Sequence, residues 1–248
     1  MAHMKKSIVI GASSGIGEAV ARELSNRGWA VGVAARRVEQ LEALAADLGA
    51  EAHVQPMDLK NVDSARAGLA SLIGKLGGMD LLLISAAMAN PHSEHSWDME
   101  KAQIDVNVTG FTALAFDGWN YFVEQGRGHL AAISSVAGLR GNRMNPMYSA
   151  SKAYMFRYLE SLRLRAIHEK LDIKVTDIRP GFIDTAMDGT KHIKEAKALR
   201  FIVLPPDKAA TQICDALDKG KRTVYVPKIW KNVELPYQVI PDFLYEKL

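Results

Sequence analysis

The sequence predicts an α/β fold: one doubly wound parallel sheet with helices on both faces, in a single domain. Three observations predict it. Short, wholly apolar runs alternate with amphipathic segments along nearly the whole chain. The first apolar run leads into a glycine-rich turn and then into a helical pattern. The chain of 248 residues suits one large sheet domain, and no linker, repeat or low-complexity tract divides it.

The strands are predicted from short runs that are largely apolar at successive positions. A strand covered by helices on both faces has this pattern, whereas a half-exposed strand alternates between apolar and polar residues. The run LLLI at Leu81–Ile84 is the clearest case. In chain order, the predicted strands are Ser7–Ile10, Trp29–Ala35, His53–Met57, Leu81–Ile84, Leu130–Ser134, Ile173–Ile178 and Thr223–Val226.

The helices are predicted from apolar residues that recur every three or four positions. The longest pattern, Met99–Glu124, contains Gly110 and Gly118, and we expect interruptions there because glycine weakens a helix interior. The pattern at Tyr148–Lys170 is apolar on more than one side, which predicts burial on two faces. The other predicted helices are Glu18–Asn26, Val38–Leu48, Val62–Leu76 and Asp207–Leu217.

Composition and charge exclude several functional classes. The formal net charge is only +3, and basic residues occur in short pairs, so we expect no nucleic-acid surface. No apolar run reaches the length of a membrane span, and no signal peptide is recognisable. The single cysteine, Cys214, excludes an internal disulfide, falls in a helical pattern and is expected in the core. These features predict a cytoplasmic protein. Residues 1–3 are interpreted as a cloning remnant.

The turn after the first strand carries the first functional signal. Its glycines, Gly11, Gly15 and Gly17, lie between a predicted strand and a predicted helix. Such a turn places backbone N–H groups and the positive end of a helix dipole where a pyrophosphate binds. The residues predicted to bind a dinucleotide here are Gly11, Ser13, Ser14, Gly15, Ile16 and Gly17.

The segment YSASK is the second functional signal. Tyr148 and Lys152 are four residues apart, so they share one face of the predicted helix. Together with the glycine spacing of the first turn, this pair resembles the short-chain dehydrogenase/reductase family, whose members are single-domain Rossmann-fold oxidoreductases that use a nicotinamide dinucleotide. The resemblance extends from Ser7 to about Val226 and implies a Rossmann-type sheet.

The resemblance implies a catalytic tetrad of Asn107, Ser135, Tyr148 and Lys152. Asn107 lies in VNVTG, and Ser135 ends an ISS run thirteen residues before the tyrosine; Ser134 remains the alternative serine. A free tyrosine has a pKa near 10, which a nearby ammonium lowers toward neutrality. By resemblance, Lys152 supplies that ammonium and holds the cofactor ribose. Ser135 then binds the substrate oxygen, and Asn107 anchors a water that leads to Lys152.

The end of the second strand predicts the choice of cofactor. A carboxylate there would favour NAD, but this chain has Ala35 followed by Arg36 and Arg37, which suit a 2′-phosphate. NADP(H) is therefore predicted over NAD(H). Asp58 resembles the family's adenine-contacting acid, with helix capping as the alternative role. The segment PGFIDT implies further cofactor contacts at Pro180, Gly181, Ile183 and Thr185.

The chain departs from the family pattern after the fourth strand. The family usually has NNAG there, and this chain has Ser85-Ala86-Ala87-Met88, which puts cofactor affinity in question. His92 and His95 follow in a loop, but no third ligand is evident, so no metal site is predicted.

The substrate side is predicted from the last third of the chain. Residues 186–204 are interpreted as an amphipathic lid, and residues 227–248 as an aromatic, proline-interrupted tail. The tail has four open roles: packing on the domain, closing the substrate pocket, contacting another subunit or touching a membrane surface. By resemblance, we expect a homodimer or homotetramer.

The sequence therefore predicts an NADPH-dependent reductase of a small-molecule carbonyl, possessing a tyrosine acid/base and running in reverse as an alcohol dehydrogenase. The alternative is a non-catalytic dinucleotide-binding regulator of the same fold, against which the complete tetrad argues. Longer epimerases and dehydratases of related type are excluded because 248 residues leave no room for their extra domain.

Overall fold

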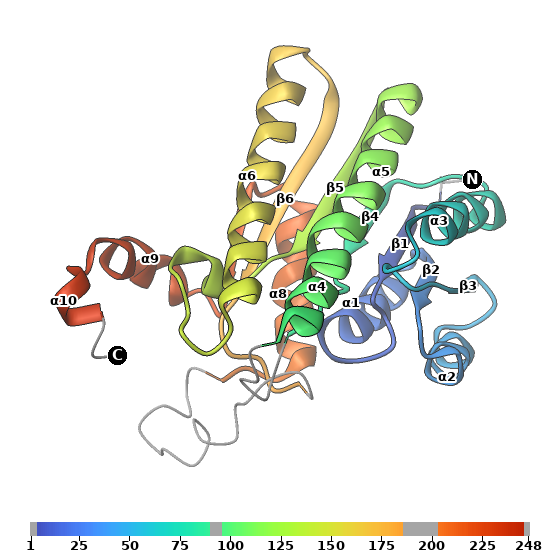
Figure 1. The fold of residues 1–248 in the computed structure, drawn as a ribbon. Helices are drawn as coiled ribbons and strands as arrows, with labels where there is room; N and C mark the ends of the chain where they lie inside the picture. Colours follow the sequence, from blue (N-terminus) through green and yellow to red (C-terminus); the bar gives the residue numbers. More distant parts are fainter. Residues whose placement is uncertain (1–3, 90–95, 186–202, 246–248) are drawn as a thin grey trace.

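The computed structural model describes residues 4–89, 96–185 and 203–245, which form a parallel sheet of seven strands (Figure 1). The strand order is β3-β2-β1-β4-β5-β6-β7, so the chain direction across the sheet reverses beside β1, as in Rossmann folds. The predicted fold class and all seven predicted strands are confirmed. Their bounds are β1 (Lys6–Ile10), β2 (Ala30–Ala35), β3 (Ala52–Pro56), β4 (Leu81–Ile84), β5 (Arg127–Ile133), β6 (Asp172–Pro180) and β7 (Thr223–Val226).

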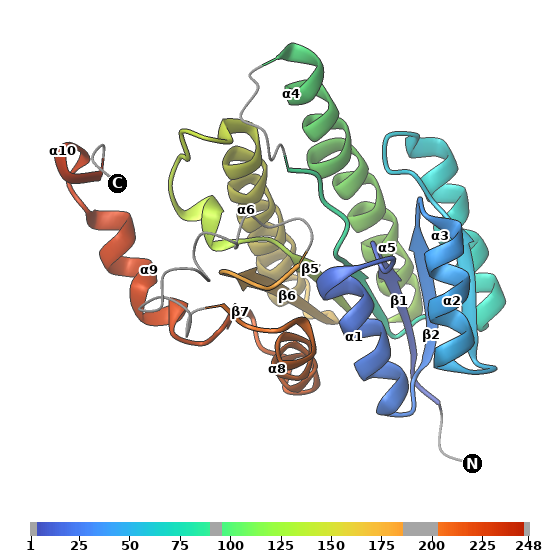
Figure 2. The ribbon, with the colours of Figure 1, turned by 90° about the horizontal axis from the view of Figure 1, so that it is seen from below.

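Helices cover both faces of the sheet. One core joins the sheet to α3 (Val62–Leu76), α5 (Phe111–Gln125) and α6 (Pro146–His168). The other core joins it to α1 (Gly15–Asn26), α2 (Val38–Leu48) and α8 (Pro206–Asp218). Figure 2 shows α1 and α8 on one side of the sheet and α4 (Trp97–Ile104), α5 and α6 on the other.

Alternation along each strand divides the buried side chains between the two cores. On β1, Ile8 and Ile10 point into one core and Val9 into the other, and all three are fully buried. Burying one such side chain stabilises the fold by about 1.5–3 kcal/mol. This two-sided burial explains why the strand runs are apolar without alternation. Cys214 on α8 is buried as expected, and burial raises the pKa of its thiol to about 12.

The long helix predicted at Met99–Glu124 is three segments. After α4, residues Asp105–Gly110 form a π-helical segment, η1, which leads directly into α5. The expectation of an interruption at Gly118 was wrong, because α5 continues through it. A Cβ on Gly118 would lie 2.4 Å from Leu82 Cδ2, so this glycine permits close packing of the helix on β4.

The tail folds as two helices, α9 (Trp230–Val239) and α10 (Asp242–Tyr245), which extend beside α6 and away from the sheet (Figure 1). Arg140, just after the 3₁₀ turn η2 (Val136–Leu139), holds this tail. Its guanidinium donates to Ile240 O at 2.5 Å and to Asp242 Oδ1 at 2.7 Å, and it lies over the Tyr245 ring. The tail thus contacts the segment that follows β5. No helix of the described ranges combines the length and apolar character needed to cross a membrane.

Candidate active site

The glycine turn joins β1 to α1 at the carboxyl edge of the sheet. Gly11 and Gly15 have φ values of +88° and +63°, which favour glycine. A Cβ on Gly17 would lie 2.3 Å from Gly11 O, so the turn closes tightly on itself. Ser14 begins α1 without capping it through its side chain, so that bond does not occupy the first N–H groups of the helix. This arrangement fits the pyrophosphate of a dinucleotide.

The arginines after β2 differ in their surroundings. Arg37 folds onto the glycine turn, where its Nη2 donates to Ser13 Oγ at 2.9 Å and to Ser14 Oγ at 2.5 Å. Arg36 is exposed, and within the described residues no hydrogen bond or ion pair of its guanidinium is found. Arg36 is therefore available to an anion at this edge, and Arg37 already braces the turn.

Asp58 follows β3 on the same edge and is exposed. Its carboxylate accepts from Lys60 N at 3.1 Å, a local turn contact. The cap of α3 is Asn61, whose Oδ1 accepts from Ser64 N at 3.2 Å. The alternative role of Asp58 as a side-chain cap of that helix is therefore wrong.

The departure at Ser85–Met88 keeps the space beside the glycine turn. The backbone N–H groups of Ser85 and Ala86 donate to Ile10 O at 2.8 and 2.9 Å. A Cβ on Gly11 would lie 2.4 Å from Ala86 N, so the two segments are already in contact. Met88 packs its side chain against the core. Small residues at 85–87 therefore replace the family motif without blocking the turn.

Asn107 connects three segments from the π-helical η1. Its side chain is 1% exposed, and it accepts from Met88 N and donates to Met88 O, both at 2.7 Å. Its Nδ2 also donates to Ser151 Oγ at 3.2 Å, and Ser151 donates to Tyr148 O at 2.8 Å. The departing segment after β4 is thus tied to the helix that carries the tyrosine and lysine.

Tyr148 and Lys152 lie in the first two turns of α6, which starts at Pro146. Lys152 is 1% exposed, its Nζ donates to Ile133 O at 2.9 Å, and this nitrogen is 5.5 Å from the centre of the Tyr148 ring. Burial lowers the pKa of Lys152 to about 7, partly opposed by the negative charge of Asp177. The predicted acid and its ammonium partner are thus side by side.

The two serines after β5 point to different surroundings. Ser134 is buried and donates to Asp177 Oδ1 and, at 2.9 Å, to Ile178 O. Ser135 is half-buried and begins η2, accepting from Ala137 N at 3.1 Å and donating to Pro180 O at 3.4 Å. Ser135 is the less buried of the two, which favours it over Ser134 as the group that could reach a substrate.

The loop after β6 completes this edge. A Cβ on Gly15 would lie 3.2 Å from Thr185 Cγ2, so the loop faces the glycine turn. Ile183 is buried and pairs with Leu204 in an isolated bridge. A Cβ on Gly181 would lie 1.9 Å from Trp230 Nε1, so the tail covers the Pro180-Gly181 step. Most of the predicted lid (186–202) and His92 and His95 lie outside the described residues.

Comparison with known proteins decides the family. Residues 5–196 match the sequence profile of the short chain dehydrogenases. The chain belongs to the short-chain dehydrogenase family. It is 35% identical over 193 residues to an uncharacterized oxidoreductase of Myxococcus xanthus (strain DK1622), which covers 76% of each chain. It is 33% identical over 214 residues to nodulation protein G of Rhizobium sp. (strain N33), which covers 84% of this chain and 85% of that protein.

Solved structures show the same fold. A 3-ketoacyl-(acyl-carrier-protein) reductase from Brucella melitensis, complexed with NADH, superposes with a TM-score of 0.81 at 19% identity, over 90% of this chain and 96% of that one. An actinorhodin polyketide ketoreductase variant with NADPH gives a TM-score of 0.79 at 24% identity, over 91% and 97%. Complexes with NADH and with NADPH therefore both occur among solved structures of this fold.

Sequence reasoning missed four residues that shape this short-chain dehydrogenase site. They are Gly138, Asp177, Arg179 and Trp230. A Cβ on Gly138 would lie 2.7 Å from Ala153 N, so η2 packs directly on α6. The available signal for Asp177 and Arg179 was that these charges share one strand face with the apolar residues Ile173 and Val175. Trp230 gave no signal, because only the fold brings the tail to Gly181.

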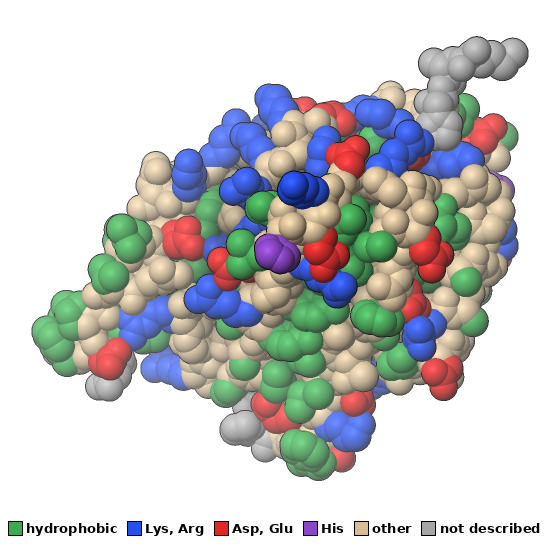
Figure 3. Space-filling view, turned by 90° about the horizontal axis from the view of Figure 1, so that it is seen from above, with side chains coloured by type: hydrophobic (Ala, Val, Ile, Leu, Met, Phe, Trp, Pro, Cys, Tyr) green, Lys and Arg blue, Asp and Glu red, His purple; other side chains and the backbone are tan. Residues whose placement is uncertain are grey.

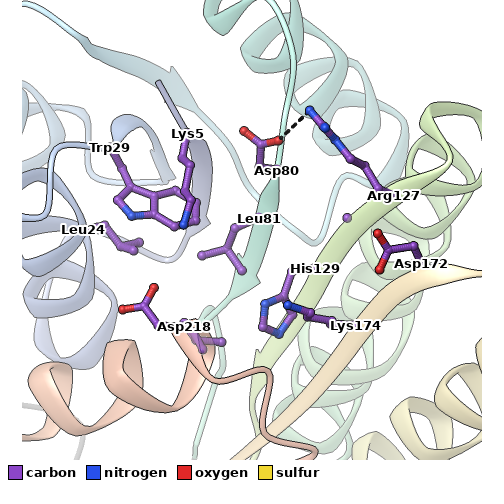
Figure 4. Close-up of a pocket in the computed structure, with 12 residues that line it drawn as sticks. Lys5, Leu24, Trp29, Asp80, Leu81, Arg127, His129, Asp172, Lys174 and Asp218 are labelled. Atoms are coloured by element: carbon purple, nitrogen blue, oxygen red, sulfur yellow. Dashed lines mark ion pairs between the residues drawn. The ribbon is translucent and has the colours of Figure 1, made fainter. Parts of the chain in front are cut away.

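A pocket of about 430 Å³ lies at the opposite, amino edge of the sheet (Figure 4). Its lining combines Leu24, Trp29 and Leu81 with charged groups, among them Lys174 and Asp218. None of the predicted site residues lines it. Figure 3, which views the molecule from this side, shows Lys and Arg side chains interspersed with Asp and Glu, so this view shows no surface of one charge sign.

Proposed function

We propose that this chain is an NADPH-dependent reductase of a small-molecule ketone or aldehyde, with Tyr148 as the general acid. The observation that carries the proposal is the burial of the Lys152 ammonium beside the Tyr148 ring, at the edge that holds the glycine turn. A buried lysine is costly, and such groups concentrate at functional sites. The complete set of site residues around it favours catalysis over a purely regulatory dinucleotide-binding protein.

The proposed chemistry assigns each side chain one task. A bound nicotinamide supplies the hydride that reduces the carbonyl carbon. The Tyr148 hydroxyl donates its proton to the carbonyl oxygen, where negative charge develops. The Ser135 hydroxyl donates a hydrogen bond to the same oxygen. The positive charge of Lys152 would favour the resulting phenolate. Its ammonium already donates to Ile133 O and contacts Met155 Sδ, and its remaining N–H would hold the cofactor ribose.

Asn107 has a positioning task in this proposal. Both hydrogens of its amide and one lone pair are already used by Met88 and Ser151. The expected water that leads to Lys152 would therefore bind mainly through other groups of η1. The side chain instead fixes the start of α6 to the segment after β4, which sets where Tyr148 lies.

The preference for NADPH rests on Arg36. Its guanidinium is exposed at the end of β2, next to Arg37, which is itself held by Ser13 and Ser14. The planar fork of an arginine matches a phosphate. The other cofactor contacts proposed are the glycine turn, Asp58 and the Pro180, Gly181, Ile183 and Thr185 loop.

The substrate side is proposed to be apolar and bounded by the tail. The rings of Trp230 and Phe182 meet edge to face with centres 5.7 Å apart, and Trp230 packs against Gly181. This aromatic surface supports an apolar substrate side. Apolar side chains are also exposed on α5 and α6, namely Phe116, Leu164 and Ile167. They support the expected homodimer or homotetramer, which light scattering after gel filtration would measure.

The outer face of the tail is a separate apolar surface. Leu235, Val239 and Phe243 are exposed there, and Figure 3 shows apolar side chains at one extremity of the molecule. Flotation with lipid vesicles tests the contact with a membrane surface that the sequence left open. Absence of flotation, with the same face protected in the oligomer, would assign it to a subunit contact.

The decisive experiment follows NADPH and NADH oxidation across ketones, quinones, keto-sugars and acyl ketones, with Tyr148→Phe alongside. We expect turnover with NADPH and a loss of about 10²–10⁴-fold in the variant, because the proton donor is removed while the ring stays. Tyr158→Phe is the matched control on the same helix, since its half-buried ring packs against Tyr154. It should retain activity. Full activity of Tyr148→Phe would refute the assignment, and NADPH binding without any turnover would favour the regulatory alternative.

A further inference from the structure

A buried ion pair lies beneath the helix that carries Tyr148 and Lys152. Residues 173, 175, 177 and 179 of β6 point to the face covered by α6. The first two, Ile173 and Val175, belong to that core, but the next two are Asp177 and Arg179. Arg179 Nε donates to Asp177 Oδ2 at 2.6 Å, and its guanidinium stacks 3.8 Å from the centre of the Phe156 ring on α6. A strand interior thus contains two charges where apolar residues would pack.

Asp177 is 2% exposed, so its carboxylate has left water almost completely. Such a group is retained at a cost unless hydrogen bonds and an opposite charge compensate it. Arg179 supplies the charge, and Ser134 donates a hydrogen bond to the other carboxylate oxygen. Burial raises the pKa of Asp177, while Arg179, Ser134 and the more distant Arg163 act in the opposite direction.

The last residue of β5 and the two residues after it each have a different contact, and Ser135 accepts from Ala137 N. The carbonyl of Ile133 accepts from Lys152, the hydroxyl of Ser134 donates to Asp177, and Ser135 starts η2. The backbone N–H of Ser134 also donates to Ile178 O at 2.7 Å, so Asp177 adds a side-chain contact to this backbone contact. It thereby helps to hold the middle residue, between the one that contacts the lysine and the one proposed to bind substrate. A displacement of Ser134 would move both neighbours, because they are joined by planar peptide units.

We propose that Asp177 is a positioning residue of this site: by holding the Ser134 hydroxyl, it fixes the backbone from which the Lys152 contact and the Ser135 hydroxyl both depart. This proposal rests on the reductase function proposed above. It gives a buried charge a task that packing alone does not require, since a hydrophobic pair would fill the same space beneath α6.

The same carboxylate also acts on the charge of Lys152. Among the described residues, Asp177 on β6 is the charged group that raises the pKa of Lys152 against the effect of burial, and Tyr148 on its own helix lies over it. Removing the Asp177 charge should therefore move Lys152 toward its neutral form.

Glu234 on α9 provides a matched control. Its carboxylate accepts from the same arginine, Arg179 Nη1, at 2.7 Å, but it is half-buried. Arg179 reaches Glu234 through a different nitrogen from the one that binds Asp177, and no contact between Glu234 and Ser134 is found in the described residues. Glu234→Gln removes one negative charge from the network without disturbing the end of β5.

The test compares Asp177→Asn, Ser134→Ala, their combination and Glu234→Gln in the full chain. The readouts are kcat, KM, NADPH affinity by fluorescence and the pH titration of Lys152 by NMR of ¹³Cε-labelled lysine, assigned with Lys152→Arg. We expect both single variants to lower kcat about tenfold or more with NADPH affinity nearly unchanged. The double variant should be no slower than the slower single one, because both act on one contact.

The Lys152 titration midpoint should fall by roughly one unit in Asp177→Asn and stay unchanged in Ser134→Ala and Glu234→Gln. Additive losses in the double variant, or an equal loss of kcat in Glu234→Gln, would overturn the proposal. If Asp177→Asn does not fold, an unchanged kcat in Ser134→Ala overturns it alone. If the wild type reduces no carbonyl, the proposed reductase function is refuted. An unchanged titration midpoint of Lys152 in Asp177→Asn refutes, independently of activity, the proposed effect of the Asp177 charge on Lys152.

Discussion

Strand β5 is in contact with a buried basic side chain near each end: His129 of the strand itself near the amino end, and Lys152 of α6 at the carboxyl end. The two contacts have opposite consequences. At the amino end, His129 is nine-tenths buried and its Nε2 hydrogen-bonds Thr176 Oγ1 at 2.8 Å. At the carboxyl end, the carbonyl of Ile133 binds the ammonium of Lys152. Burial lowers the pKa of both groups, to about 4 for His129 and about 7 for Lys152.

The difference lies in what each group would be in water at neutral pH. A histidine is mostly neutral there, so burying it removes little charge near pH 7. A lysine is fully charged there, so its burial opposes folding. The amino end therefore has an ordinary packed histidine beside a pocket. The carboxyl end has a lysine whose charged form burial disfavours, as is common at functional sites.

The largest expected effect is that of Lys152→Met. Activity should fall by about 10²–10⁴-fold, because the charge that tunes Tyr148 is lost. The same change should raise the free energy of unfolding at pH 7 by about 2–4 kcal/mol, since a buried charge is replaced by an apolar chain of similar length. Urea unfolding at pH 7 and pH 10 measures it.

The stabilisation of Lys152→Met relative to the wild type should become smaller as the pH rises. The folded pKa of Lys152 is about 7 against the ordinary 10.5, so the unfolded chain binds more protons between these values. The unfolding free energy of the wild type therefore rises with pH between about 7 and 10.5, because burial of Lys152 becomes less costly once it is neutral. Lys174→Met is the control at the amino end, where the lysine is exposed and should matter little. A destabilised Lys152→Met would refute the contrast between the two ends.

An intermediate effect is expected from His129 on mild acidification. Its folded pKa of about 4 lies below the ordinary 6.5, so the unfolded chain takes up the proton first and stability is lost as pH falls through this range. Between pH 7 and pH 5, this group should cost about 2 kcal/mol of unfolding free energy. Urea unfolding of the wild type and His129→Gln at both pH values measures it. His168→Gln, at an exposed histidine, should keep the wild-type dependence.

The smallest expected effect concerns cofactor preference at the carboxyl edge. Arg36→Asp should lower the NADPH-to-NADH ratio of kcat/KM by about tenfold or more, because an exposed phosphate partner is replaced by a repelling charge. Steady-state kinetics with both cofactors measures the ratio. Arg127→Asp, at the exposed amino end of β5, should leave it unchanged. Equal ratios in both variants would remove Arg36 from the cofactor site.

The fold was predictable because strands that are buried on both faces have apolar residues at nearly every position. Leu81–Ile84 and Thr223–Val226 match β4 and β7 residue for residue. The π-helical turn was not predictable, because a helix with one extra residue has nearly the same apolar pattern. The helices of the tail were not predicted either, because its prolines and aromatic residues hide the helical spacing of apolar residues. The tail is also held by Arg140 and Arg179, which lie far from it in the sequence.

The candidate site was predictable where local motifs carry it. Gly17, Tyr148 and Lys152 lie in short patterns whose spacing alone suggests their geometry. Asp177 lies in no such pattern, and its contact with Ser134 depends on neighbouring strands 43 residues apart in sequence. Side chains that act through pairing between strands are therefore the ones that sequence reasoning misses.

The π-helical segment at Asp105–Gly110 sets the rotational phase between α4 and α5. Each residue of an α-helix turns the chain by about 100°, so one residue removed from this segment would rotate α4 by that angle against α5. Phe111 and the rest of α5 would remain packed in the core, while Asn107 would lose its hydrogen bonds to Met88 and Ser151. The proposed catalytic arrangement therefore depends on the number of residues in this segment, a requirement that the packing of the core does not impose.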